Sequence, residues 1–155
     1  MEKVEKDFEE LLRFFRRRKV RYCIVGAFAV GFHAISRYTK DMDILVEPTE
    51  ENGKKICWAL KDFGFGSLKI TPKDFSRKGS FIQLGVEPVR VDLITSIVGV
   101  SFEQAWMNRR RGRYGKTEAF FIGLDDLIKN KQACGRKQDF VDLEILRRAK
   151  KKRPL

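Results

Sequence analysis

Apolar residues near the amino terminus recur at the spacing of one helix face. Between Glu2 and Arg18 they fall three or four residues apart, with charged residues between them. These positions are Val4, Phe8, Leu11, Leu12 and Phe15. The period predicts an amphipathic helix. Two apolar runs follow, over 20–25 and 41–47, and each predicts a short buried strand. Between these strands, the segment 27–35 predicts a short helix that begins after a turn at Gly26.

Helix and strand patterns continue to alternate in the middle of the chain. Thr49 can cap a helix that runs to Phe63, because its hydroxyl can accept a hydrogen bond from the first turn. The segments 79–86 and 89–97 then alternate apolar and polar residues and are separated by only two residues. This pattern predicts two neighbouring antiparallel strands.

The carboxy-terminal third is more polar. A short helix is expected over 101–106, and 109–123 predicts an exposed basic loop or ribbon followed by a short strand. Residues 124–148 predict two helices that are broken near Gly135. The second of these helices has an apolar stripe that we expect in the core, at Phe140, Val141, Leu143, Ile145 and Leu146. The whole pattern predicts an α/β (α+β) fold with a small mixed sheet flanked by helices and with carboxy-terminal helices.

The length of 155 residues is typical of a single domain. Within it we expect a core over about 20–123, a helical carboxy-terminal part over 124–149 and a basic tail over 150–155. The hydrophobic fraction of 43% favours a folded protein over a disordered one. No apolar run approaches the roughly 20 residues of a membrane span, and the first ten residues are charged. We therefore expect no membrane association and a cytoplasmic location.

The net charge of +12 is concentrated towards the carboxy terminus. Residues 104–155 contain 15 Lys and Arg against 6 Asp and Glu, whereas residues 1–103 contain 18 against 15. A basic region of this kind attracts phosphates, so a nucleic acid or a nucleotide is an expected partner. A solvated basic surface without a partner is the alternative.

The cysteines and the histidine do not predict a zinc site. Cys23, Cys57 and Cys134 are widely spaced without a C-x-x-C pair, and His33 is the only histidine. The pattern indicates reduced thiols and a structural histidine. Any metal is therefore expected on oxygen ligands.

Asp41 and Asp43 form the most informative pair in the chain. In a strand, residues i and i+2 project from the same face, so the two carboxylates lie side by side while Met42 points to the other face. Carboxylates this close repel one another, and a divalent cation such as Mg²⁺ stabilises such an arrangement. Asp92, on a later strand, is a candidate third acid. Three carboxylates from two strands can hold two metal ions about 3.5 to 4 Å apart, as in phosphoryl and nucleotidyl transfer. Solvent-facing aspartates on an edge strand are the alternative.

The segment "VGAFAVGFHAISRYTKDMDIL", followed by "VRVDLI", resembles the nucleotidyltransferase superfamily, which includes DNA polymerase beta, the kanamycin nucleotidyltransferases and the tRNA CCA-adding enzymes. "RYTKDMDIL" and "GLDDLIKNKQACGRKQDFVDLEIL" are similar to small stand-alone nucleotidyltransferases related to the toxins of abortive-infection systems. The resemblance covers most of residues 20–148. It implies a strand, a glycine turn, a helix, a pair of acids and a third acid on a later strand.

By this resemblance, Asp41, Asp43 and Asp92 are the catalytic and metal-binding acids, for two Mg²⁺ ions or for Mn²⁺. Gly26 takes the first position of the nucleotide-binding turn and Ala27 the second. The superfamily usually has glycine or serine at that second position, so Ala27 lacks a hydroxyl for the triphosphate but keeps its backbone amide.

The resemblance also implies a supporting role for three residues that flank the acids. Arg37 and Thr39 precede the acidic pair and are expected to bind nucleotide, with a plain surface arginine as the alternative for Arg37. Lys131 is expected to contact the triphosphate or the transition state. The alternative is a salt-bridge network that joins Lys131 or Arg136 to Asp139.

Two functions follow as hypotheses. The first is an enzyme that transfers a nucleoside monophosphate from a nucleoside triphosphate to a hydroxyl of an RNA such as tRNA, a protein side chain or a small molecule. The basic loop 108–116 and the basic carboxy-terminal third favour RNA, and the toxin-like proteins suggest an antitoxin partner. The second is a binding module of the same fold that holds nucleotide, RNA or an antitoxin without turnover.

Overall fold

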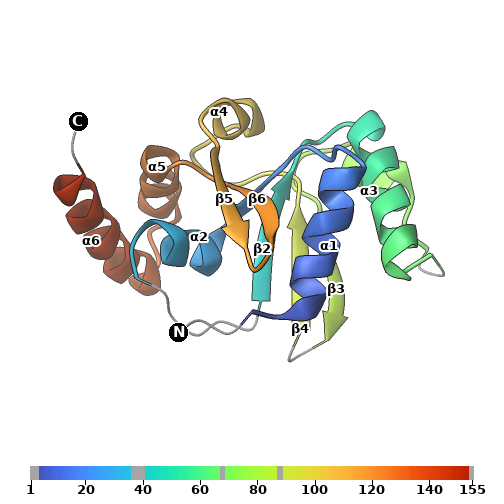
Figure 1. The fold of residues 1–155 in the computed structure, drawn as a ribbon. Coiled ribbons are helices and arrows are strands. Elements are labelled where there is room, and N and C mark those ends of the chain that lie inside the picture. The colour runs from blue at the N-terminus through green and yellow to red at the C-terminus, as the bar shows by residue number, and fades with distance from the viewer. Residues whose placement is uncertain (1–3, 36–40, 67–68, 87–88, 154–155) are drawn as a thin grey trace.

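The computed structural model describes residues 4–35, 41–66, 69–86 and 89–153. Its helices and strands, in chain order, are α1 (Lys6–Arg17), β1 (Tyr22–Val25), α2 (Gly26–His33), β2 (Asp41–Val46), α3 (Glu50–Phe63), the 3₁₀ turn η1 (Pro72–Phe75), β3 (Phe81–Val86), β4 (Val89–Ile94), α4 (Phe102–Met107), β5 (Arg110–Tyr114), β6 (Thr117–Phe121), α5 (Leu124–Cys134) and α6 (Lys137–Lys152). Figure 1 shows these elements arranged as a twisted sheet between two groups of helices. The α/β class is confirmed.

The sheet has six strands in the order β3-β4-β2-β1-β6-β5. It is mixed, since β2 pairs parallel to β4 and β1 parallel to β6, while the remaining neighbours pair antiparallel. The predicted antiparallel pair formed by β3 and β4 is confirmed. β5 and β6 form a second hairpin where a basic loop or ribbon followed by a strand was expected.

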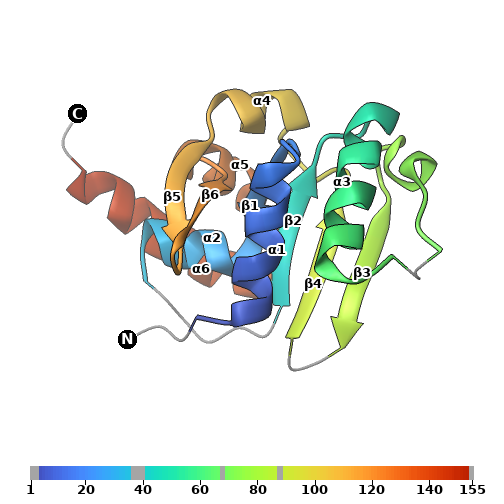
Figure 2. The ribbon, with the colours of Figure 1, turned by 45° about the vertical axis from the view of Figure 1, so that its right-hand side comes forward.

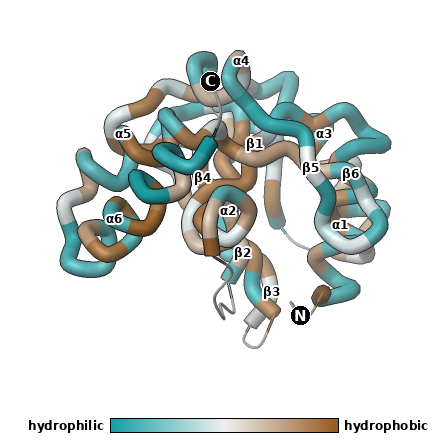
Figure 3. Tube along the Cα trace, turned by 60° about the vertical axis from the view of Figure 1, so that its left-hand side comes forward, coloured by the Kyte–Doolittle hydropathy of each residue, from teal (hydrophilic) through white to brown (hydrophobic). Residues whose placement is uncertain are grey.

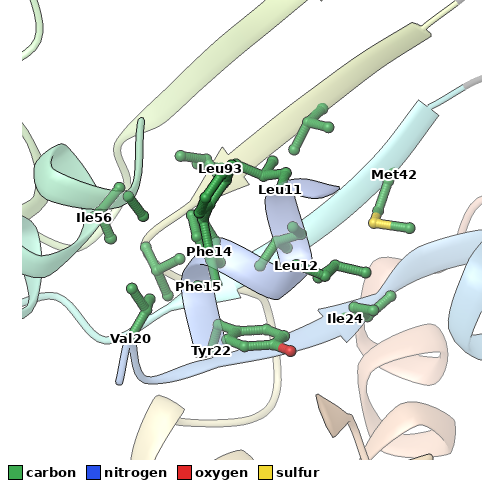
Figure 4. Packing of buried hydrophobic residues seen from close by; sticks show 14 of the residues in the cluster. Leu11, Leu12, Phe14, Phe15, Val20, Tyr22, Ile24, Met42, Ile56 and Leu93 are labelled. Carbon is green, nitrogen blue, oxygen red and sulfur yellow. The ribbon is translucent and has the colours of Figure 1, made fainter. Parts of the chain in front are cut away.

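Helices α1 and α3 cover one face of the sheet (Figure 2). Phe15 and Leu12 of α1 pack on Tyr22, Ile24 and Met42, as Figure 4 shows, and all five side chains are 2% exposed or less. The side chain of Thr49 caps α3 by accepting a hydrogen bond from the backbone amide of Asn52 (3.1 Å), as the sequence predicts.

Helices α2, α4 and α5 and the middle of α6 cover the opposite face. Alternate residues of the strands point to this side, among them Cys23 and Val25 of β1 and Leu45 of β2, and they pack on Leu127 of α5 and Leu146 of α6. This second cluster spans only part of the sheet. Beyond its edge, the first residues of β2 present Asp41 and Asp43 on this face.

Two details of α6 differ from the sequence-based expectation. Phe140 and Val141 were expected in the core but are 60% and 54% exposed, because the buried side of α6 is formed by Asp139, Asp142, Leu143 and Leu146. The helix also continues to Lys152, so much of the expected tail 150–155 is helical. Within the described residues, no helix is long and apolar enough to span a membrane.

Candidate active site

The two acids of β2 and the third acid of β4 lie next to one another on the same face of the sheet. In the parallel β2–β4 ladder, Asp43 is in register with Asp92, and Asp41 is in register with Arg90. Neighbouring strands are about 4.8 Å apart, so residues in register present adjacent side chains. Met42, which points to the other face, is fully buried in the core. The structure thus brings together the three carboxylates that the sequence singled out.

Arg90 lies between two of these carboxylates. Its Nη2 atom is 2.8 Å from Asp41 Oδ2 and 3.1 Å from Asp92 Oδ2. Arg90 was not among the site residues predicted from the sequence. The signal was available, because the alternation of "VRVDLI" places positions 90 and 92 on one face.

Asp43 has an unusual electrostatic environment. Burial raises the pKa of its carboxyl from 3.8 to about 6, and the charge of Asp92, a hydrogen bond with Asp92 and the charge of Asp41 add to this, while Arg90 opposes it. Asp92 is only 3% exposed, and its Oδ1 atom receives no hydrogen bond from an N–H or O–H group of the described chain unless Asp43 is protonated. The position between Asp43 and Asp92 therefore favours a positive species, either a proton or a cation.

Gly26 closes the site on the side of β1. It is the first residue of α2 and has φ +67°, and an added Cβ would come within 2.5 Å of Asp43 Oδ2. The carboxylate of Asp43 consequently lies directly beside the amino terminus of α2. Val25, the preceding residue, provides no side-chain cap for this helix end. Backbone amides at such an end can bind phosphate oxygens, and the amide of Ala27 belongs to this first turn.

The residues present fit a divalent cation between Asp43 and Asp92. Carboxylate oxygens are the ligands that Mg²⁺ and Mn²⁺ prefer, and the Oδ1 atom of Asp92 is buried without a hydrogen-bond partner among the described residues. A complete site of three or more acidic, histidine or cysteine ligands is not formed within the described residues. The position of Arg90 explains this, because its guanidinium occupies space between Asp41 and Asp92.

A buried ion-pair network lies at the junction of α5 and α6. Lys131 is 5% exposed, and its Nζ atom is 3.3 Å from Asp139 Oδ1 and 3.3 Å from Asp142 Oδ2. Arg136 donates from Nε to Asp139 Oδ2 (2.8 Å) and from its backbone amide to the same oxygen (3.0 Å). These hydrogen bonds from Arg136, with a smaller contribution from Lys131, lower the pKa of Asp139 to about 2 against the opposing effect of burial. This is the network that was the alternative for Lys131.

Arg136, unlike Lys131, faces solvent at this junction. Its side chain is 71% exposed, whereas that of Lys131 is 6% exposed. Its pKa is raised mainly by the hydrogen bond and charge of Asp139, and the charge of Asp43 makes a smaller contribution in the same direction. From the sequence, Arg136 was expected only as a member of the alternative salt-bridge network.

Arg37, Thr39 and His33 are the other residues for which the sequence predicted a role. Arg37 and Thr39, expected to bind nucleotide, lie outside the described residues. His33 is buried at the end of α2, where its Nε2–H donates to the carbonyl oxygen of Ile122 (2.6 Å) and its Nδ1 atom accepts from Arg153 (3.1 Å). Burial is the main cause that lowers the pKa of His33, which fits the structural role expected for it.

No protein-family model matches this sequence, and no curated protein matches it. Solved structures do share its fold. The lincosamide antibiotic adenylyltransferase LnuA, bound to lincomycin, superposes with a TM-score of 0.59 at 15% identity, over 93% of this chain and 96% of that one. The antibiotic-resistance factor ANT(2″)-Ia gives 0.60 at 9% identity, over 91% and 80%.

A third structure is similar over nearly its whole length. TM1012 from Thermotoga maritima, a provisionally assigned nucleotidyltransferase, superposes with a TM-score of 0.54 at 17% identity, and the match covers 97% of both chains. At such identities the likeness concerns the fold. The predicted fold is confirmed, and the chain has the nucleotidyltransferase fold.

Proposed function

We propose that this protein is a metal-dependent nucleotidyltransferase that transfers a nucleoside monophosphate from a nucleoside triphosphate to a hydroxyl group. The observation that carries the proposal is the position of Asp43. It is in register with Asp92 on the neighbouring strand and in contact with Gly26 at the amino terminus of α2. One carboxylate pair therefore lies beside one phosphate-binding helix end, which is the arrangement that this reaction requires.

Each residue of the site has a part in this reaction. Asp43 and Asp92 would hold a divalent cation, and Asp41 would join them if the guanidinium of Arg90 moved aside. The bound cation would polarise the phosphoryl oxygens and stabilise the leaving pyrophosphate. The backbone amides at Gly26 and Ala27 bind phosphate oxygens, and Asp92 accepts the proton of the attacking hydroxyl.

The cation that contacts the triphosphate is assigned to Arg136. It is exposed and lies within electrostatic range of Asp43, whereas the ammonium of Lys131 is buried between two carboxylates. Lys131 then supports nucleotide binding indirectly, because it fixes Asp139, and Asp139 in turn orients Arg136. Arg37 and Thr39 are further proposed contacts that precede the acidic pair.

The proposed acceptor is a hydroxyl of RNA. Residues 104–155 carry 15 basic residues against 6 acidic ones, and such a surface matches a polyanion better than a small neutral molecule. By contrast, LnuA is a lincosamide antibiotic adenylyltransferase, and ANT(2″)-Ia is an antibiotic-resistance factor. A toxin role with an antitoxin partner is a narrower proposal that rests on the resemblance of the α5–α6 segment.

The test uses Asp43→Asn, with Asp7→Asn on the exposed surface of α1 as the matched control. Calorimetry with ATP, GTP, CTP and UTP, with and without Mg²⁺, measures nucleotide binding. Pyrophosphate release with total RNA measures turnover. We expect Mg²⁺-dependent binding and turnover in the wild-type protein and in the control. Asp43→Asn should keep the fold and lose pyrophosphate release, and full activity in that variant would refute the assignment.

A binding module of the same fold is the second candidate. The observation that favours it is Arg90, whose guanidinium already neutralises Asp41 and Asp92 without a metal. In that case wild-type protein would bind RNA equally well with and without a chelator, and it would release no pyrophosphate with any nucleotide.

A further inference from the structure

A groove of about 660 Å³ lies away from the acids, between the end of α4, the start of β5 and the α5–α6 hairpin. Figure 3 shows this side of the molecule, with the hydrophilic end of α6 near α4 and α5. The basic side chains that line it are Arg109, Arg110, Lys129, Lys150 and Arg153. The carboxylates that line it are Asp125 and Asp126. The groove therefore has an excess of positive charge.

The two carboxylates are already engaged. Asp125 Oδ1 lies 2.9 Å from Lys150 Nζ, and this exposed pair neutralises itself. Asp126 is 2% exposed and accepts hydrogen bonds from Gln104 Nε2 (2.9 Å) and Asn108 Nδ2 (3.1 Å). Within the described residues, neither carboxylate forms an ion pair with the remaining cations of the groove.

As far as the structure describes the chain, four of the five cations, Arg109 among them, are not paired with carboxylates. Arg110 and Lys129 are exposed and have no salt bridge within the described part of the chain. Arg153 donates from Nη2 to Nδ1 and to the backbone oxygen of His33. These positive charges are spread along an open groove, which suits a row of phosphates better than a single carboxylate.

Arg109 forms the inner wall of the groove. Its guanidinium lies 3.6 Å from the ring centroid of Trp106 and 4.8 Å from that of Phe120, and its Nη1 donates to the carbonyl oxygen of Trp106 (2.7 Å). These contacts hold the charge in place, so the groove is preorganised rather than formed by mobile side chains alone.

Helix α2 connects the groove to the acids. Its last residue, His33, contacts Arg153 at the groove, and its first residue, Gly26, contacts Asp43. Eight helical residues span about 12 Å.

We propose that this groove binds the phosphate backbone of a single-stranded RNA whose end carries the acceptor hydroxyl. The inference rests on the proposed nucleotidyl transfer and names its acceptor site. Phosphates lie against Arg110, Lys129 and Arg153, and the strand passes α2 towards Asp43 and Asp92. Binding is independent of sequence, because the groove contacts come from charges rather than from base edges.

The test removes two exposed charges from the groove, Arg110→Ala with Lys129→Ala. The matched control removes two exposed charges elsewhere, Lys54→Ala in α3 with Lys78→Ala. Fluorescence anisotropy with a short labelled single-stranded RNA measures affinity over a range of salt concentrations. Each lost phosphate contact lowers the slope of log affinity against log salt by about 0.7, so the groove variant should lose about 1.4 from the slope. At about 0.1 M salt this corresponds to a loss of affinity on the order of 25-fold. The control should stay close to wild type.

Equal losses in both double variants, or an unchanged affinity in the groove variant, would overturn the proposal, as would a wild-type protein that does not bind RNA. Calorimetry with Mg²⁺ and nucleoside triphosphate on the same proteins separates this result from the proposed function. If the protein binds nucleotide but not RNA, only the proposed role of the groove is refuted. If the protein binds RNA through the groove charges but does not bind nucleotide, the proposed nucleotidyl transfer is refuted and the RNA-binding groove is supported.

Discussion

Asp43 and Gly26 are in such close contact that a side chain at position 26 would meet Asp43 Oδ2 at 2.5 Å. Gly26 also has φ +67°, a conformation that other residues adopt at a cost of about 1–2 kcal/mol. The carboxylate can therefore lie beside this helix end only because residue 26 has no Cβ atom.

Gly26→Ala should therefore weaken nucleotide binding and stability together. Gly79→Ala is a suitable control, because Gly79 has φ +83° with no atom within 4 Å of an added Cβ. Both variants should lose about 1–2 kcal/mol of unfolding free energy from the backbone. Only Gly26→Ala should lower the affinity for a Mg²⁺–nucleotide complex, measured by calorimetry. A normal nucleotide affinity in Gly26→Ala would show that phosphate does not bind at this helix end.

The raised pKa of Asp43 should make both the folding stability and the Mg²⁺ affinity depend on pH. Its pKa is raised from 3.8 to about 6 mainly by burial, so the folded protein holds this proton more tightly than the unfolded chain does. This stabilising contribution is fully present below about pH 4 and is lost as the pH rises through about 6. Binding of Mg²⁺ requires the carboxylate, so Mg²⁺ affinity should rise over the same interval.

Calorimetric titration with Mg²⁺ and thermal unfolding in a chelator, each on both sides of pH 6, measure the two effects. In Asp43→Asn both pH dependences should become smaller. Identical profiles for the variant and the wild-type protein would assign the titration to another group.

Replacing Arg90 should have opposite effects on Mg²⁺ affinity and on the stability of the metal-free protein. Arg90→Gln removes the charge that separates Asp41 from Asp92. Mg²⁺ affinity should rise, because the cation no longer competes with a guanidinium. Without metal, the variant should lose about 1.5–3 kcal/mol of unfolding free energy.

Arg21→Gln breaks the more exposed ion pair with Glu47 and serves as the control, with an expected loss of about 0–1 kcal/mol. Denaturant unfolding in a chelator and calorimetry with Mg²⁺ are the measurements. If Mg²⁺ affinity falls in Arg90→Gln, the arginine supports the metal site instead of competing for it.

Lys131 and Arg136 should differ in their effects. Lys131→Met leaves Asp139 and Asp142 buried without their shared ammonium and should reduce stability by about 3–5 kcal/mol. Arg136→Ala changes an exposed side chain, so it should affect stability less but lower nucleotide affinity more. Arg148→Ala, which breaks an exposed ion pair with Glu144, should change neither. Thermal unfolding and calorimetry at a temperature where all variants are folded decide the assignment. Unchanged nucleotide affinity in Arg136→Ala would return the triphosphate contact to Lys131.

Local patterns predicted much of this fold. Thr49 caps α3, the alternating segments form the β3–β4 hairpin, and the i, i+2 spacing places Asp41 and Asp43 on one face. These features depend on a few neighbouring residues and on the strand period of two. The same period shows that Arg90 shares a face with Asp92.

The tertiary structure decided the relations between distant segments. Only the pairing of β2 with β4 sets Asp43 opposite Asp92 and places Arg90 between the acids. A sequence period states which face a side chain occupies, but not which strand lies beside it or in what register.

In helix α6, too, the local pattern predicted the helix, whereas tertiary packing decided which side of it is buried. Its helical period was visible in the sequence, yet Phe140 is 60% exposed while Asp139 and Asp142 are fully buried. Of the apolar stripe predicted for the core, Leu143 and Leu146 are buried, whereas Phe140 and Val141 are exposed. Burial of the aspartates is stable because Lys131, from a different helix, supplies the counter-charge, and its position depends on how α5 and α6 pack together. The sequence by itself determined the elements and the acids; the packing of distant elements decided which charges meet at the site.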